Sequence, residues 1–344
     1  MANLDLLKPF TVEKPEPLIG AKTIQLILMR EVLDYTVLRT EDTRELNTVA
    51  TPLSVSENDK TIMRVAFLAT KQKAAESRQL EQMLRTAKSE LKLAHIHRKV
   101  KQGEKEVEAT LLTDNVQSKD ERVDECYLKD NLCLECPRCG LFGATSVEAG
   151  RQERANIKHR LEYSTAFSLL PFEDIESATT FNAINDVNQT TGQALGSRYA
   201  VVPATVFPSI VTLRSVTLTE VILTIKTLLA CKSYGAESRI GGDMRNSIFG
   251  IVGGWEEVIT PLELTLELYD QRGKINGDAV KAIVEKYKPL AGNPEKVTLL
   301  TPDQVDGLVT DIANTALDKK FLEAAYADVA QYRQAQAGIK KRGR

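Results

Sequence analysis

The chain has 344 residues, 42% of them apolar and 27% charged, and its formal net charge is −2. This composition is that of a globular protein of about two domains, and it excludes wholesale disorder. The near-neutral charge provides no overall attraction to nucleic acid, so any binding of RNA or DNA requires positive charge gathered on one face.

No apolar run reaches the roughly 18 residues that a membrane helix needs. The first 20 residues carry acids and prolines where a signal peptide has a basic start and an apolar run. We therefore expect a cytoplasmic protein without a membrane partner. In that compartment, clustered cysteines indicate a metal site or catalysis rather than disulfides.

The first elements in chain order are two buried strands. Residues 1–20 are expected to form an extended leader. The mostly apolar runs 23–30 and 63–70 predict the strands, and the polar residues 31–60 between them predict an insertion.

A helix is predicted next, because apolar residues recur there at helical spacing: Leu80, Leu84, Ala87 and Leu91. Residues 97–125 are charged in both signs and have no apolar period. This pattern predicts a solvated or mobile stretch that leads into the cysteines.

Strands dominate the second half of the expected core. Residues 160–169 alternate between apolar and polar side chains, which is typical of a half-buried strand, and residues 207–217 predict another. Thr217 and Glu220 then form a capping box that starts a helix. The alternating leucines of 262–268 predict a last strand.

The C-terminal region is expected to be helical from Thr301 onward, where Thr-Pro-Asp is a helix start signal. The order of strands and helices predicts an α+β fold. It favours a ferredoxin-like core, with helices on one face of an antiparallel sheet.

Four cysteines lie within 14 residues in the stretch "CYLKDNLCLECPRCGLFGA": Cys126, Cys133, Cys136 and Cys139. Four thiolates satisfy the tetrahedral preference of zinc and close a structural site. Because the short spacings are unusual, His95 or His97 remains an alternative to one of the cysteines. The remaining cysteine, Cys231, is expected to pack in the core.

Three further segments have residue types suited to nucleic acid. Residues 177–197 are polar with one charge and predict a projecting hairpin, with Phe181 as a wedge at its tip. The glycine-rich residues 235–254 contain Arg239 and Arg245, which suit phosphates. Lys71, Lys73 and Arg78 stand at a predicted strand-to-helix junction, where free amides attract anions.

Five segments occur together in one order: the strand 23–30, the "TKQK" junction, "CPRCGLFGAT", the polar hairpin and "RIGGDMRNSIFG". With these segments the chain resembles the backbone subunit of the type I-D CRISPR surveillance complex, Cascade, in the RAMP superfamily. The resemblance implies a modified RNA-recognition-motif core with a zinc-binding insertion, a β-hairpin thumb and a helical C-terminal region. The implied segments are core 21–95 with insertion 31–60, zinc insertion 96–154, core strand 155–170, thumb 171–205, core 206–290 and helical region 291–344.

The resemblance also implies partners and site residues. Copies of the chain would polymerise on CRISPR guide RNA beside other Cascade subunits, and the guide would pair with target DNA. The implied RNA contacts are Lys71, Gln72, Lys73, Arg78, Phe181, Arg239, Gly241, Gly242 and Arg245. The implied zinc ligands are the four clustered cysteines.

Two other functions remain open at this point. A related scaffold could cut target RNA or single-stranded DNA at intervals, with Asp186 or Asp243 as the acting residue, although a single aspartate in a loop is usually a turn residue. A stand-alone zinc-ribbon nucleic-acid protein is the other alternative, and it would bind without forming a filament.

Overall fold

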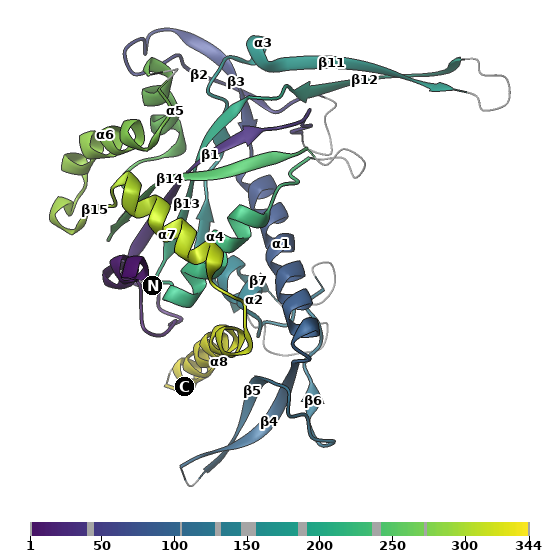
Figure 1. Ribbon diagram of the computed structural model, residues 1–344, viewed down its shortest axis with the longest axis vertical. Coiled ribbons are helices and arrows are strands. Elements are labelled where there is room, and N and C mark those ends of the chain that lie inside the picture. Colours follow the sequence, from purple (N-terminus) through teal and green to yellow (C-terminus); the bar gives the residue numbers. More distant parts are fainter. Residues whose placement is uncertain are drawn as a thin grey trace.

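The computed structural model describes residues 2–39, 45–103, 105–127, 132–145, 156–184, 191–235, 242–271 and 274–342. A five-stranded antiparallel sheet lies at its centre, in the order β15-β14-β1-β13-β9 (Figure 1). The strands are β1 (Thr23–Val32), β9 (Leu161–Tyr163), β13 (Val206–Arg214), β14 (Met244–Gly254) and β15 (Thr298–Leu299). The fold is therefore mixed α+β, as expected.

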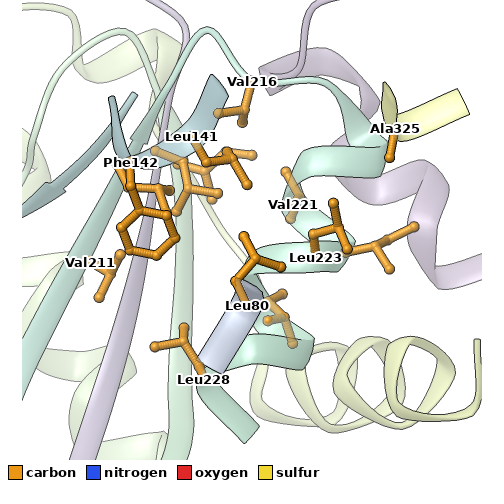
Figure 2. Close-up of a cluster of buried hydrophobic side chains, with 14 of the residues drawn as sticks. Leu80, Leu141, Phe142, Val211, Val216, Val221, Leu223, Leu228 and Ala325 are labelled. Carbon is orange, nitrogen blue, oxygen red and sulfur yellow. The ribbon is translucent and has the colours of Figure 1, made fainter. Parts of the chain in front are cut away.

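Helices cover both faces of this sheet. Leu26 and Leu28 of β1 belong to the apolar cluster that includes α1 (Ala69–Glu90) and α4 (Leu218–Ala230), part of which Figure 2 shows. Ile27 and Met29 point the other way, into the cluster that includes α5 (Pro261–Asp270) and α6 (Gly277–Tyr287). The expectation of helices on one face is thus wrong: β1 is buried at nearly every position, so both of its faces need cover.

The expected glycine-rich loop at 235–254 is also wrong over most of its length, because β14 is a long strand that pairs with β1. The β14 glycines Gly250 and Gly253 leave room for neighbouring side chains to pack against the strand. A Cβ atom added at Gly253 would lie 2.3 Å from the ring of Phe10. Phe10 ends the first helix, η1 (Ala2–Phe10), whose Leu4 and Leu7 are buried, so the N-terminal segment is not an extended leader.

The leucine-rich segment 262–268 forms helix α5 rather than a strand. Thr260 and Glu263 make a complete capping box, and Pro261 occupies the first helical turn. Leu264 and Leu268, four residues apart, are fully buried. Leucine and glutamate are good helix formers, and this local preference with the cap outweighs the alternation.

The expected strand at 160–169 is divided between two sheets. β9 belongs to the central sheet, whereas β10 (Ala166–Phe167) pairs with β3 (Thr61–Phe67), which pairs with β2 (Thr48–Pro52). Arg160 and Ser168, expected on the solvent side, are buried. They are buried because each is hydrogen-bonded to a different part of the core.

Two hairpins extend away from the body at opposite ends (Figure 1). One is β11 (Glu176–Ile184) with β12 (Thr191–Val201), preceded by α3 (Phe172–Ile175). The other, β4 (Ala94–Gln102) with β5 (Lys105–Thr113) and the short β6 (Glu121–Arg122), replaces the expected mobile stretch. Opposite charges face each other across this second hairpin, as in Lys99–Glu108 and Lys101–Glu106, so a charged sequence still pairs as strands.

The C-terminal region is helical as expected. Helix α7 (Pro302–Asn314) begins at a Thr301 capping box. Helix α8 (Lys319–Arg342) packs against β5 and α2 (Pro137–Phe142). The remaining elements are β7 (Ala144–Thr145), β8 (Asn156–Ile157), η2 (Lys288–Leu290) and η3 (Pro294–Lys296). Within the described ranges, no helix combines the length and apolar character needed to cross a membrane.

Candidate metal centre and nucleic-acid interface

The four clustered cysteines form one compact group. Their sulfur atoms all lie within 4.8 Å of one another, and the Cys126 and Cys139 sulfurs are 3.5 Å apart. Four sulfurs around a zinc ion at a Zn–S distance of roughly 2.3 Å would be about 3.8 Å apart. The donor set and its dimensions therefore fit a tetrahedral metal.

The local sequence explains how this group forms. Cys136 is the N-cap of α2, and Pro137 starts the helix, so that Cys139 turns back toward the other thiols. Burial leaves the Cys126, Cys136 and Cys139 side chains almost inaccessible. Hydrogen bonds from the other three thiols lower the pKa of Cys139, whereas hydrogen bonds with Cys126 raise the pKa of Cys133 and Cys136.

Neither histidine alternative joins the group. His95 is buried with its ring 4.7 Å from that of Tyr326, and burial lowers its pKa to about 3. His97 lies 3.8 Å from a carboxylate oxygen of Glu135. Among the described residues, the group that could hold a metal ion therefore consists of the four cysteines.

The start of α1 carries two of the predicted basic residues, Lys71 and Lys73, whereas Arg78 lies near the middle of the helix. α1 has no acidic residue in its first turn and no side-chain cap, Lys71 and Lys73 are partly exposed, and Arg78 is exposed. Gln72 corrects the prediction, because it is fully buried and its amide donates to the carbonyls of Phe67 and Ser164. Its role is to hold α1 to the neighbouring strands.

A buried polar network beneath α1 was not predicted. Arg30 of β1 pairs with Glu76 of α1 at 2.7 Å, and both side chains are fully buried. The hydroxyls of Tyr163 and Tyr234 donate to the two Glu76 oxygens at 2.6 and 2.8 Å. Burial raises the pKa of both tyrosines, which remain neutral donors. Arg30 is a charged residue within an apolar strand pattern. This charge is the only sign in the sequence that Arg30 has a buried partner.

The glycine-rich segment meets this network. Phe67, directly before α1, contacts the ring of Tyr234 edge-on, and the Tyr234 amide donates to the Gly242 carbonyl. Gly242 is buried at a φ of 61°, and a Cβ atom there would lie 2.6 Å from the Gly235 nitrogen. The turn therefore requires this glycine, which corrects its expected contact with RNA.

Arg245 stays exposed at the start of β14 and forms an ion pair with Glu31. The base of the β11–β12 hairpin is adjacent, since Val201 pairs with Thr36. The α1 start, the β14 start and the hairpin base thus gather at one end of the central sheet. Arg239 and Gly241 lie outside the described residues.

Phe181 is not placed at the hairpin tip. It lies within β11, opposite Gly196 of β12, whereas residues 185–190 connect the strands. Asp186 falls outside the described residues. Asp243 is exposed, and its backbone carbonyl accepts a hydrogen bond from Leu33.

One protein family matches this chain. The model of the Csc2 CRISPR family matches residues 10–326. The crystal structure of Thermofilum pendens Csc2 is similar with a TM-score of 0.58 and 18% identity, over 96% of this chain and 95% of that one. At this identity the likeness shows a shared fold.

Two other solved structures are more distant. A chain of a CRISPR RNA-guided surveillance complex has a TM-score of 0.47 and 11% identity, over 84% of this chain and 99% of its own. A chain of a Type IV-B CRISPR complex has a TM-score of 0.39 and 14% identity, over 65% and 90%. No curated protein matches the sequence.

Proposed function

This chain belongs to the Csc2 CRISPR family and is a backbone subunit of CRISPR surveillance complexes, and we propose that several copies assemble head to tail along a type I-D guide RNA. The family match over residues 10–326 carries the proposal. Each copy would hold guide phosphates, which needs no sequence preference. Base pairing with target DNA would then supply the specificity.

We infer that the central sheet is a modified RNA-recognition motif. In support, the four strands β14-β1-β13-β9 are adjacent in that order, with α1 between β1 and β9 in the chain and α4 between β13 and β14. This is the strand–helix–strand–strand–helix–strand arrangement of ferredoxin-like folds. RNA-recognition motifs stack bases on the open sheet face, but α5 and α6 cover that face here, so the proposed RNA contacts lie at the end of the sheet.

The proposed guide contacts are cations at that end. The cations that would bind phosphates are Lys71 and Lys73 at the start of α1, Arg78 further along α1, and Arg245 at the start of β14. Arg239 and Gly241 stay predictions. The β11–β12 hairpin, whose tip residues follow Ile184, would reach the next copy and separate stretches of guide.

We propose that the four cysteines hold a structural zinc ion. Four protein thiolates leave no open position for a substrate, so zinc would supply folding free energy to the segment around α2 rather than chemistry. The chain's own contribution is the geometry: the α2 N-terminus and the turn after it set the positions of Cys136 and Cys139.

We propose a scaffold without catalysis. Asp243 is exposed and pairs with no histidine or second acid among the described residues, so nothing in its surroundings favours hydrolysis. The alternative of interval cleavage is tested by Asp186→Ala and Asp243→Ala variants on complementary RNA and single-stranded DNA. If both variants cut these substrates as the wild-type protein does, neither aspartate is the catalytic residue.

The deciding experiment identifies the RNA that the protein carries. The chain is expressed with a repeat–spacer array and companion subunits, treated with nuclease after purification, and the protected RNA is sequenced. Guide RNA protected in regular steps is expected. A Lys71→Glu/Arg78→Glu double variant should lose the protection, whereas Lys281→Glu on α6, far from the α1 start in the fold, should keep it. A random RNA mixture on the wild-type protein would contradict the proposal.

A further inference from the structure

The segment 126–145 that carries the four clustered cysteines is called the cysteine module below. Arg138 connects this module to the side of α1. Its Nε donates to the Ser77 hydroxyl of α1 at 2.8 Å, and its Nη1 donates to the Gly143 carbonyl at 3.4 Å. Nη1 also lies 3.9 Å from the Cys139 sulfur. In the described part of the chain Nη2 makes no hydrogen bond, and it is not among the buried unpaired atoms. The guanidinium is therefore held in place with one edge open.

Two more basic side chains belong to or lie beside segments that Arg138 contacts. Lys73 is four residues before Ser77 and so lies on the same face of α1. Burial lowers the pKa of Lys73, and the nearby charge of Arg138 lowers it further. His159 follows the turn at Gly143, where a Cβ atom would lie 2.9 Å from the His159 nitrogen. Burial and then the charge of Lys73 lower the His159 pKa.

These three groups come from separate segments, and Arg138 contacts the Cys139 thiol, whose pKa its charge helps to lower. No carboxylate of the described residues is within salt-bridge distance of any of them. Glu162, the one acid whose charge reaches His159, is already paired with Arg214 at 2.7 Å. The Cys139 sulfur offsets part of the Arg138 charge at Nη1. Lys73 and the open edge of Arg138 still repel each other, and an anion between them would relieve that repulsion.

We propose that Arg138, Lys73 and His159 form one phosphate-binding site, which holds a phosphodiester of single-stranded RNA and connects the cysteine module to the RNA-binding end of the sheet. The inference rests on the proposed function, and it adds Arg138 and His159 to the contacts. The open edge of a fixed guanidinium is suited to a phosphate because the planar fork presents its donors in parallel.

The test measures binding of a 5′-labelled single-stranded RNA to the full-length, zinc-loaded protein by fluorescence anisotropy at several salt concentrations. Arg138→Gln and Lys73→Gln should each weaken binding about tenfold. Each should also reduce the slope of log K against log salt by about 0.7, the value for one phosphate contact on a single strand. Arg138→Lys should fall between wild type and Arg138→Gln.

Arg85→Gln is the matched control. Arg85 also joins α1 to the cysteine module, through the Cys126 carbonyl at 3.4 Å, but it pairs with Glu81. It should keep wild-type affinity and slope. Zinc content and melting temperature are measured for every variant, and if Arg138→Gln loses zinc, Lys73→Gln decides.

The outcomes separate this inference from the proposed function. Wild-type affinity and slope in folded Arg138→Gln and in Lys73→Gln, together with weaker binding by Arg78→Gln, would overturn the site and leave the proposed function standing. Failure of the wild-type protein to bind RNA would overturn the proposed function itself.

Discussion

Buried arginines join distant parts of this chain. Arg160 pairs with Glu220 and donates to the Gly140 carbonyl, so it connects β9, α4 and the cysteine module. Arg64 donates to the carbonyls of Ser168 and Leu53. A buried charge is stable only when paired and hydrogen-bonded, so each arginine specifies one arrangement of the segments around it.

The Arg160–Glu220 pair predicts a large effect from one substitution. Glu220→Ala would leave Arg160 buried without a counter-charge and would break the α4 capping box. We expect a loss of about 3–5 kcal/mol in the free energy of unfolding, measured by urea denaturation. Glu263→Ala is the control, because it breaks the same capping motif on α5 at an exposed position. It should cost only about 1 kcal/mol. Equal losses would show that the buried pair adds nothing.

Asp328 of α8 predicts a pH dependence. Burial raises its pKa to about 6, although the Thr217 hydroxyl donates to it at 2.7 Å. The folded state therefore binds this proton more tightly than the unfolded state, so its contribution to stability is complete below pH about 4 and is lost as pH rises through about 6.

Asp328→Asn mimics the protonated form. Its melting temperature should exceed that of wild type at pH 7, and the difference should vanish near pH 4. Asp59→Asn, at an exposed turn, is the control and should show no such pH-dependent difference. A constant difference across the range would contradict the assignment.

At the scale of elements, the β11–β12 hairpin stands apart from the sheets. Apart from the bridge between Val201 and Thr36 at its base, its two strands pair only with each other within the described ranges, and it projects from the body (Figure 1). An isolated two-stranded hairpin is marginally stable in water. In the assembled complex, another surface is therefore expected to support it.

Shortening this hairpin should separate assembly from folding. Replacing residues 179–198 by a Gly-Ser turn should leave the melting temperature within about 2 °C, since it shortens a separate two-stranded hairpin and leaves the central sheet intact. It should prevent regular protection of guide RNA. Shortening β4–β5 by residues 100–107 is the control, because it removes a projecting tip at the other end. Intact protection without the β11–β12 tip would contradict the proposed role of this hairpin.

The cysteine module is a second element with its own test. Cys136→Ser should release zinc and lower the protection of amides around α2 in hydrogen exchange, because the metal is proposed to hold this short segment. Cys231→Ala, the fifth cysteine, should keep the zinc content. An unchanged zinc content in Cys136→Ser would mean that the ligand set is different.

At the scale of the whole molecule, 45 basic residues face 47 acidic ones, so RNA affinity must come from where the charges lie. We expect light scattering to show complexes whose mass increases with RNA length. One copy bound to short and long RNA alike would favour a stand-alone zinc-ribbon protein.

Features that depend on neighbouring residues could be predicted from the sequence. The apolar runs of β1 and β3, the period of α1, the capping boxes of α4 and α7 and the cysteine cluster all express short-range spacing, and the structure confirms them. The family resemblance is based on the order of these motifs along the chain. It requires no knowledge of the contacts between them. The match to the Csc2 CRISPR family confirms the CRISPR family, and the type I-D subtype stays a prediction.

Only the tertiary structure decided features that depend on distant partners. Residues 244–254 became a central strand because β1 pairs with them, and Gly253 is needed because Phe10 packs there. Arg160 and Gln72 became buried because carbonyls from other segments meet them. Arg138 gained its place beside Lys73 because α2 packs against α1. Such contacts join residues far apart in the chain, and no local pattern encodes them.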